Sequence, residues 1–207
     1  MIFHIISSII GHICLILSEI MNYYNKILDS GKTVFSKKDL EKILNFNTQN
    51  ALDKFLYREK EKWFLINISR WIYVLKKHNL FELASKVRKK SYISLETVLK
   101  KHWVIFQYYD EVFIVSDNTV EKKVWDTVFR FSKVKDSVLL NQLWLEHKWL
   151  YTIASIERAI CDKIYLSKHY YFDDLSDIDF KKLEEISKIY KNKRLISEVN
   201  TLINTYA

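Results

Sequence analysis

Side chains suited to nucleic-acid recognition cluster between positions 37 and 70 of the sequence. Gln49 and Asn50 carry carboxamides, which can pair with two atoms of an adenine edge in the DNA major groove. Arg70 sits where a hairpin tip is expected and could reach a minor groove or a phosphate. The alternative for each residue is an ordinary solvated side chain. The candidate DNA-binding residues are Lys37, Lys38, Thr48, Gln49, Asn50, Lys54, Arg58 and Arg70.

Three other patterns could carry catalysis or bind a metal. Cys161 with His147 or His169 could form a nucleophile and base, but a cysteine on an apolar helix is more often a core residue. The acidic run from Asp173 to Asp179 lacks the glycine and terminal glutamate of a calcium loop. The two isolated glycines, Gly11 and Gly31, exclude a glycine-rich phosphate loop. We therefore expect no enzyme, metal or cofactor.

Composition and charge set the class of protein. The 207 residues are 49% apolar and carry a net charge of +8, so a packed core is expected. Glu19 is the only ionised side chain in residues 1–21, which leaves 33 basic and 24 acidic side chains in residues 22–207. This excess favours a polyanionic partner, although ordinary solubility would also account for it. Two cysteines without a CxxC pair argue against a zinc ribbon or a disulfide framework and for a cytoplasmic protein.

The elements expected to position these residues form a winged helix over residues 22–77. A helix over residues 23–28 ends before Gly31, a left-handed cap position. Ser36 and Asp39 form a capping-box pattern for a second helix, and Thr48 caps a third. A hairpin follows, with strands 64–68 and 71–75 joined at Ser69 and Arg70. Such a fold can place its third helix in the major groove, although some winged helices bind only protein.

Residues 78–207 are expected to form a mixed α/β domain with antiparallel hairpins and C-terminal helices, which makes the fold class α+β. The last two helices should divide near Asn192, with Ser176 and Asp179 forming another capping box. Expected strands cover 111–116, 122–125, 128–134, 143–145 and 149–153, with a turn at Asp126 and Thr127. Expected helices begin at Phe81 and at Leu95, with a short extended link at 92–94 between them, and further helices cover 154–168 and much of 177–206.

Residues 1–21 form an apolar N-terminal extension. It has no basic residue before its apolar run, which a signal peptide needs. The run is also short for a membrane-spanning helix, and His4, Gly11 and His12 interrupt it. Three interpretations remain open. The extension is a tail helix that docks on the protein, a stretch upstream of a true start at Met21, or a membrane anchor.

Four stretches of the sequence, which follow one another in the family order, resemble the AbiEi-type antitoxins of type IV toxin–antitoxin (abortive infection) systems. They are GKTVFSKKDLEKIL, INISRWIYVL, SYISLETVLKKHWVI and IASIERAICDKIYL. The chain departs from the family pattern at Trp71, where a glycine is usual, and at Ile156, where proline is common. Glu96, Glu157 and Asp162 match family positions, and we expect them to brace helices.

The resemblance implies a DNA-binding antitoxin that is also a transcriptional regulator. It would bind inverted repeats in its own promoter as a monomer or weak dimer. It would also counteract a nucleotidyltransferase-like toxin without a stable complex. The alternative is a protein-interaction or membrane-tethered adaptor that uses the winged helix without DNA.

Overall fold

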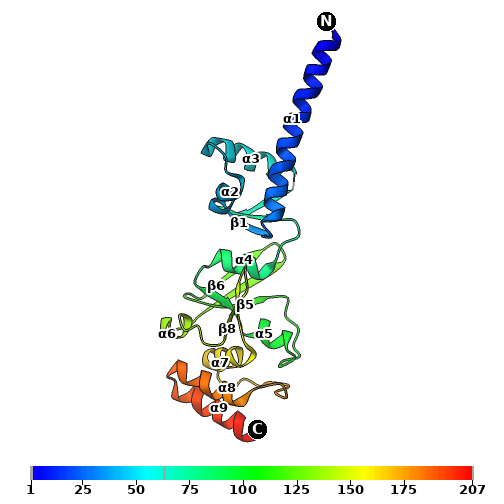
Figure 1. Ribbon diagram of the computed structural model, residues 1–207. Coiled ribbons are helices and arrows are strands. Elements are labelled where there is room, and N and C mark those ends of the chain that lie inside the picture. The colour runs from blue at the N-terminus through cyan, green and yellow to red at the C-terminus, as the bar shows by residue number, and fades with distance from the viewer. Residues whose placement is uncertain (1, 63, 207) are drawn as a thin grey trace. The chain divides into compact units, whose positions relative to one another are not determined.

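The computed structural model describes the backbone of residues 2–62 and 64–206, and side chains from Ile13 to Tyr206 except those of Leu15, Ile16 and Trp63. The chain divides into two compact units, residues 1–79 (unit 1) and residues 80–207 (unit 2) (Figure 1). Helices and strands occur in both units, so the fold is mixed α+β with antiparallel hairpins and C-terminal helices, as the sequence predicts at this level.

Unit 1 combines three helices with a small antiparallel sheet. The strand order in the sheet is β1-β3-β2, so the β2–β3 hairpin is extended by a short strand from earlier in the chain. Its elements are α1 (Ile2–Asp29), β1 (Val34–Ser36), α2 (Lys37–Leu44), α3 (Gln49–Lys62), β2 (Leu65–Ser69) and β3 (Ile72–Leu75).

The ends of the unit 1 helices are fixed by the residues that the sequence predicts. Ser36 Oγ accepts the Asp39 amide at 3.2 Å, and the Asp39 carboxylate accepts the Ser36 amide at 2.7 Å, which confirms the capping box of α2. Thr48 Oγ1 accepts the Ala51 amide at 3.3 Å at the start of α3. Gly31 has φ 64°, the left-handed conformation expected after α1.

The core of unit 1 forms where the inner faces of its helices meet the sheet. Tyr23 on α1 packs against Phe46 and Phe55, and Tyr24 packs against Phe64. The buried residues of this core are Ile27, Phe35, Leu40, Leu44, Leu52, Phe55, Leu56 and Leu65. Because α3 buries one face here, its opposite face is left for solvent or a ligand.

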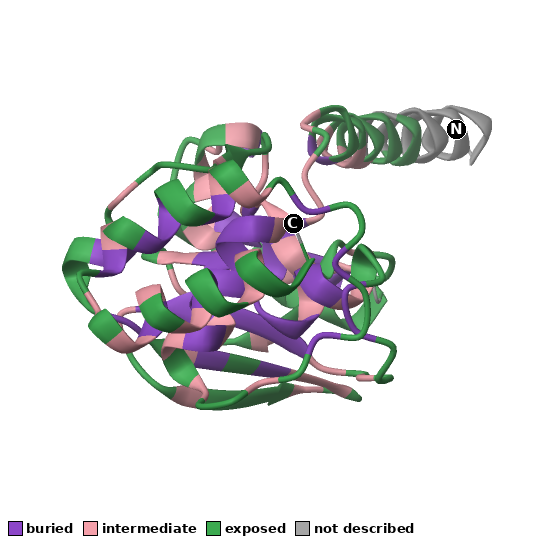
Figure 2. Ribbon diagram, turned by 90° about the horizontal axis from the view of Figure 1, so that it is seen from below, coloured by how far each residue is buried: buried purple, intermediate pink, exposed green. Residues whose placement is uncertain are grey.

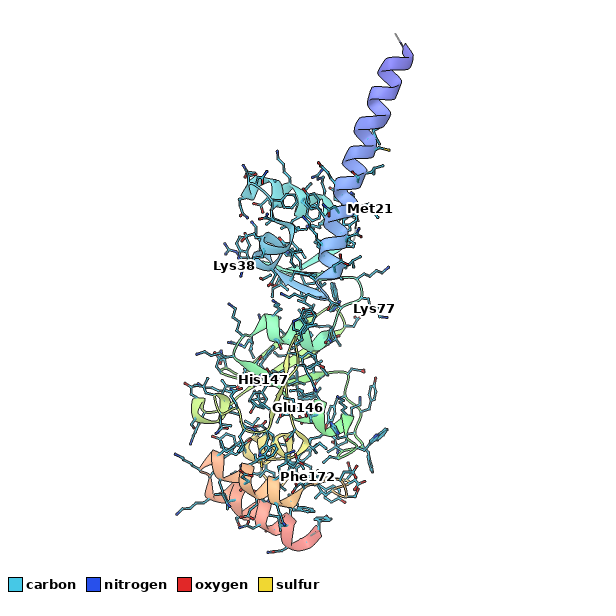
Figure 3. The ribbon with its side chains drawn as sticks, viewed as in Figure 1. Met21, Lys38, Lys77, Glu146, His147 and Phe172 are labelled. Carbon is cyan, nitrogen blue, oxygen red and sulfur yellow. The ribbon has the colours of Figure 1, made fainter. Side chains whose placement is uncertain are left out.

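Helix α1 is longer than the helix predicted over residues 23–28. It runs without a break through Met21, which is labelled in Figure 3, and it extends well past α2 and α3 in Figure 1. The described side chains Ile13, Cys14 and Leu17 are exposed, so they are not part of the core of unit 1. Among the described residues, no helix combines the length and apolarity needed to cross a membrane.

Unit 2 is built on a six-stranded sheet with the order β6-β7-β5-β4-β9-β8. The buried residues gather between the sheet and its helices (Figure 2). The elements are α4 (Leu80–Val87), β4 (Ser91–Ile93), α5 (Glu96–Lys101), β5 (Val112–Ser116), β6 (Val120–Val124), β7 (Thr127–Lys133), α6 (Asp136–Leu139), β8 (Leu145–His147), β9 (Thr152–Ala154), α7 (Ile156–Leu166), α8 (Phe180–Ser187), the 3-10 helix Lys188–Tyr190 and α9 (Lys193–Tyr206).

Both predicted hairpins of unit 2 exist, but their turns differ from prediction. In the β6–β7 hairpin Val124 pairs with Thr127, so the turn is Trp125 and Asp126, and Trp125 takes the left-handed position with φ 51°. The β8–β9 turn covers 148–151. Glu146 and His147, which fall between the two predicted strands 143–145 and 149–153, lie instead in β8, an edge strand whose side chains can face water.

The predicted capping box of Ser176 and Asp179 is wrong. Asp179 is itself the residue that caps α8, and its Oδ1 accepts the Lys182 amide at 3.1 Å. The Ser176 amide instead donates to Asp174 Oδ1 at 2.9 Å. Aspartate is as good a helix cap as serine, so the sequence pattern alone does not select between the two starts.

Candidate nucleic-acid interface

The outer face of α3 carries most of the predicted DNA contacts. Leu52, Phe55 and Leu56 are buried, and the residues between them face outward. The exposed residues at and along α3 are Thr48, Gln49, Asn50, Asp53, Lys54, Tyr57, Arg58, Lys60, Glu61 and Lys62. Helical geometry thus brings the carboxamides and cations of the sequence prediction onto one surface.

The tip of the β2–β3 hairpin lies beside this face. A groove of about 420 Å³ lies between α3 and the hairpin, and Tyr57, Lys60, Asn67, Arg70 and Trp71 contribute to its lining. The predicted tip, Ser69 and Arg70, is displaced by one residue to Arg70 and Trp71. A β-bulge between Asn67 and Ser69 lengthens β2 and causes the displacement.

Two side chains that the sequence analysis did not select fix the shape of the tip. Asn67 Nδ2 donates to the carbonyl oxygens of Ser69 at 3.1 Å and Ile72 at 3.3 Å. Trp71 has φ 74°, so the backbone keeps a left-handed conformation that glycine adopts at lower cost. An asparagine near an expected hairpin tip is the one sequence signal that could have indicated this brace.

The Trp71 ring lies between two cations. The Arg70 guanidinium carbon is 5.2 Å from the ring centre and Lys37 Nζ is 5.1 Å from it. Cation–π attraction at this range favours an ordered tip. The ring is 50% exposed, so it remains available to a ligand while it holds Arg70 in place.

The structure distinguishes the two lysines that begin α2. Lys37 Nζ forms an ion pair with Asp53 on α3 at 2.5 Å, and its side chain is only 15% exposed. Lys37 therefore joins α2, α3 and the Trp71 ring, and Asp53 compensates its charge. Lys38 is exposed at the surface of unit 1 (Figure 3).

The acidic residues of α3 reduce its positive charge less than their number suggests. Glu59 is buried, accepts a hydrogen bond from the Tyr24 hydroxyl at 2.8 Å and lies 3.7 Å from Lys62 Nζ. Burial, the hydrogen bond and the charge of Glu59 raise the pKa of Tyr24 to about 12. Because Asp53 is paired with Lys37 and Glu59 is buried, the outer face of α3 presents mainly cations, and its exposed acids are Asp53 and Glu61.

The surroundings of Cys161 and His147, the candidate nucleophile and base of unit 2, are those of packed or hydrogen-bonded residues. Cys161 is fully buried with its Sγ 3.8 Å from the Leu183 carbonyl oxygen, and burial raises the pKa of its thiol. His147 on β8 places Nδ1 3.1 Å from Thr152 Oγ1 (Figure 3). Within the described part of the chain, no three histidine, cysteine or acidic residues lie together in a group that could hold a metal ion.

The acidic run of unit 2 serves local backbone groups. The Asp173 carboxylate accepts the Phe106 amide at 2.8 Å. Asp174 accepts the Ser176 amide, which lowers the pKa of this exposed carboxyl group. Asp179 caps α8. Asp173, Asp174 and Asp179 therefore each accept a hydrogen bond from a nearby or neighbouring backbone amide.

A buried polar cluster surrounds Asp162 on α7. Its Oδ1 accepts hydrogen bonds from the Tyr92 hydroxyl at 3.0 Å and the Tyr190 hydroxyl at 2.7 Å, and its Oδ2 accepts one from Ser94 at 2.7 Å. Arg158 Nε lies 3.9 Å from Oδ1, and all of these residues are buried. Burial raises the pKa of Asp162, and Arg158 and the hydroxyls oppose that rise.

The predicted bracing role of the acidic residues in unit 2 is confirmed. Asp162 connects β4, α7 and the segment that follows α8, as described above. Glu96 on α5 forms an ion pair with Lys163 on α7, and Glu157 on α7 forms one with Lys182 on α8. Helix α7 is therefore anchored by polar contacts on several sides, in addition to its apolar face.

Comparison with known proteins gives no assignment. No protein-family model matches the chain, and no curated protein matches it.

Proposed function

We propose that unit 1 is a winged helix that binds DNA and that the chain is an AbiEi-type antitoxin that represses its own operon. One observation carries the DNA-binding part. The exposed face of α3 presents Gln49 and Asn50, and the braced β2–β3 tip beside it presents Arg70. Carboxamides suit base edges, and an arginine at a hairpin tip suits a phosphate or a minor groove.

The electrostatics of this surface support the proposal. Lys38, Lys54 and Arg58 are exposed, whereas Lys37 is paired with Asp53 and acts in positioning the tip. Exposed cations on one surface release counterions when they meet phosphates, and this release drives non-specific DNA binding. The base-reading residues would then select the site.

The DNA-binding part is tested by a gel shift with the duplex upstream of the chain's own gene. Binding is expected at low salt, and changing Gln49 and Asn50 to Ala should weaken binding to this duplex more than to an unrelated one. Cys161→Ala, which alters the core of unit 2, should leave DNA binding intact. Failure of the full chain to bind the upstream duplex at low salt would exclude repression by this surface.

The antitoxin part rests on the four sequence stretches that resemble the AbiEi family. Unit 2 would counteract a nucleotidyltransferase-like toxin encoded beside the chain. Co-expression with the neighbouring gene tests this directly, because the full chain should restore growth. A variant with Gln49, Asn50 and Arg70 changed to Ala should still restore growth if DNA binding and neutralisation use different units. A neighbouring gene of another kind, or no rescue, would contradict this part.

A protein-interaction adaptor is the second candidate. Tyr57 is 68% exposed and Trp71 is 50% exposed on the same surface, and such aromatic residues are enriched at protein interfaces. Salt dependence separates the two functions. DNA binding should weaken steeply as salt is raised, whereas a contact centred on these rings should change little.

A further inference from the structure

The sequence of α1 carries a heptad repeat. Apolar residues recur at alternating spacings of four and three, the pattern that forms the core of a coiled coil. Polar or small residues occupy one position of each heptad on the opposite side, at His4, Gly11, Ser18 and Asn25. The core positions are Ile2, Ile6, Ile9, Ile13, Ile16, Ile20, Tyr23 and Ile27.

The C-terminal end of this apolar stripe packs in the core of unit 1. Ile27 is fully buried, and the Tyr23 ring packs 4.6 Å from Phe46 and 5.7 Å from Phe55, measured between ring centres. The stripe is therefore a packing surface in the folded protein, and its register is fixed where the helix joins the core.

Toward the N-terminus, the described side chains of the same stripe become exposed. Ile13 is 50% exposed, and Leu17, which lies beside it on the helix, is 55% exposed. Helix α1 is continuous here, so these side chains follow in register from the buried end. Apolar residues in such a repeat are typical of a helix that packs against another helix.

We infer that this part of α1 associates with α1 of a second copy of the chain in a coiled coil. A heptad stripe of isoleucines is complementary to itself, as a contact between identical subunits requires. Over residues 2–21, nine apolar residues fill the two core positions of the repeat and the position beside them. They are Ile2, Phe3, Ile6, Ile9, Ile10, Ile13, Ile16, Leu17 and Ile20. At roughly 60–120 Å² per side chain, they would bury roughly 540–1,080 Å² on each copy. A stable interface buries about 800 Å² per partner.

A lipid surface fits the helix less well. Helices that lie on membranes carry Lys or Arg along the polar face. Here the polar positions hold histidine, glycine, serine and asparagine, and the first basic residue of the chain is Lys26. Isoleucine at both core positions of the heptad favours bundles of more than two helices. The measured mass is therefore expected at two copies or, as this pattern favours, at three or four.

The association is tested by the mass of the full chain in sedimentation equilibrium. The expected mass is a multiple of 25.0 kDa. Ile13→Glu places a charge on the stripe and should return the mass to that of one chain. Ser18→Glu places the same charge on the polar side and should leave the assembly intact. Near-ultraviolet circular dichroism should be unchanged in both, since both positions are exposed and outside the core.

A second measurement uses the exposed thiol of Cys14. Because Cys161 is buried, a spin label should attach selectively at Cys14. Dipolar coupling between labels on different copies is expected, and Ile13→Glu should remove it. A wild-type chain that sediments as a single copy would overturn the inference, and so would a single-copy chain that floats with lipid vesicles. The inference does not depend on DNA binding: an oligomer that binds no DNA would contradict only the proposed function.

Discussion

Arg70→Ala tests the proposed interface most directly, because the salt dependence of DNA binding counts phosphate contacts. Lys38, Lys54, Arg58 and Lys60 are the other exposed basic side chains taken as phosphate contacts. Lys62 at the end of α3 is also exposed but is not counted because it pairs with Glu59. If all five contact phosphates, log K should fall with log salt at a slope of about −4.5, and loss of one contact should change it to about −3.6.

The expected loss of affinity follows from the same slopes. At about 0.1 M salt, removal of one phosphate contact should weaken binding about eightfold. Between about 50 and 200 mM salt, affinity should fall about 500-fold for the wild type and about 150-fold for Arg70→Ala. Fluorescence anisotropy with the labelled upstream duplex measures both quantities.

A matched control distinguishes a contact from a change in overall charge. Lys122 on β6 of unit 2 is exposed and outside the proposed interface. Lys122→Ala removes one positive charge, as Arg70→Ala does, and should leave the slope near the wild-type value. Equal slopes for Arg70→Ala and wild type would refute the phosphate contact. An equal change in the Lys122 variant would refute its location at the hairpin tip.

Three further changes test the packing that supports the units. Asp162→Asn should lower the free energy of unfolding by about 3–5 kcal/mol in urea titrations, because a buried arginine loses its counter-charge, whereas exposed Asp177→Asn should change it by under about 0.5 kcal/mol. A loss below about 1 kcal/mol for Asp162→Asn would contradict this account. Tyr24 has its pKa raised to about 12 in the folded state, so its contribution to stability is complete below pH 10, the ordinary pKa. That contribution should be lost between pH 10 and 12, and Tyr24→Phe should remove that part of the decline seen in alkaline unfolding curves. Trp71→Gly should keep the fold, as monitored by circular dichroism, but weaken DNA binding because Arg70 loses its stacking partner; unchanged affinity would exclude a role for the ring.

Local signals predict the helices of unit 1 well. The capping box at Ser36, the cap at Thr48 and the left-handed Gly31 each depend on residues within three or four positions, so their chemistry can be read directly. The length of α1 could not be read in this way. The chemistry of the sequence changes at Met21, but both parts have helical periodicity, and the helix continues through it.

Pairing between distant strands is the part that the sequence does not reveal. β4 lies between β5 and β9, and β9 pairs with it in parallel although the two strands are some sixty residues apart. β5 and β7 are also parallel. A three-residue strand such as β4 has too few residues to show an alternating pattern, so the sequence indicates only an extended link there.

The buried cluster around Asp162 shows a related limit. The sequence places Asp162 on a helix and predicts a bracing role, but its partners Tyr92, Ser94 and Tyr190 come from 28 to 70 residues away. A charged residue on an otherwise apolar helix could equally belong to an active site. Only the tertiary structure shows that three hydroxyls and Arg158 enclose the carboxylate.

Trp71 connects the sequence departure to the proposed activity. In the antitoxins that the chain resembles, glycine is usual at this position. Trp71 takes φ 74° there, at a cost of roughly 1–2 kcal/mol for a residue with a side chain. The Lys37 and Arg70 contacts with the ring and the Asn67 hydrogen bonds can offset that cost. Side chains thus hold the strained tip conformation, and the same contacts fix Arg70 at the surface. If the strain serves DNA binding, Trp71→Gly should relieve the backbone strain and lower the affinity for DNA at the same time. If the tryptophan has only a structural role, Trp71→Gly should not produce both effects.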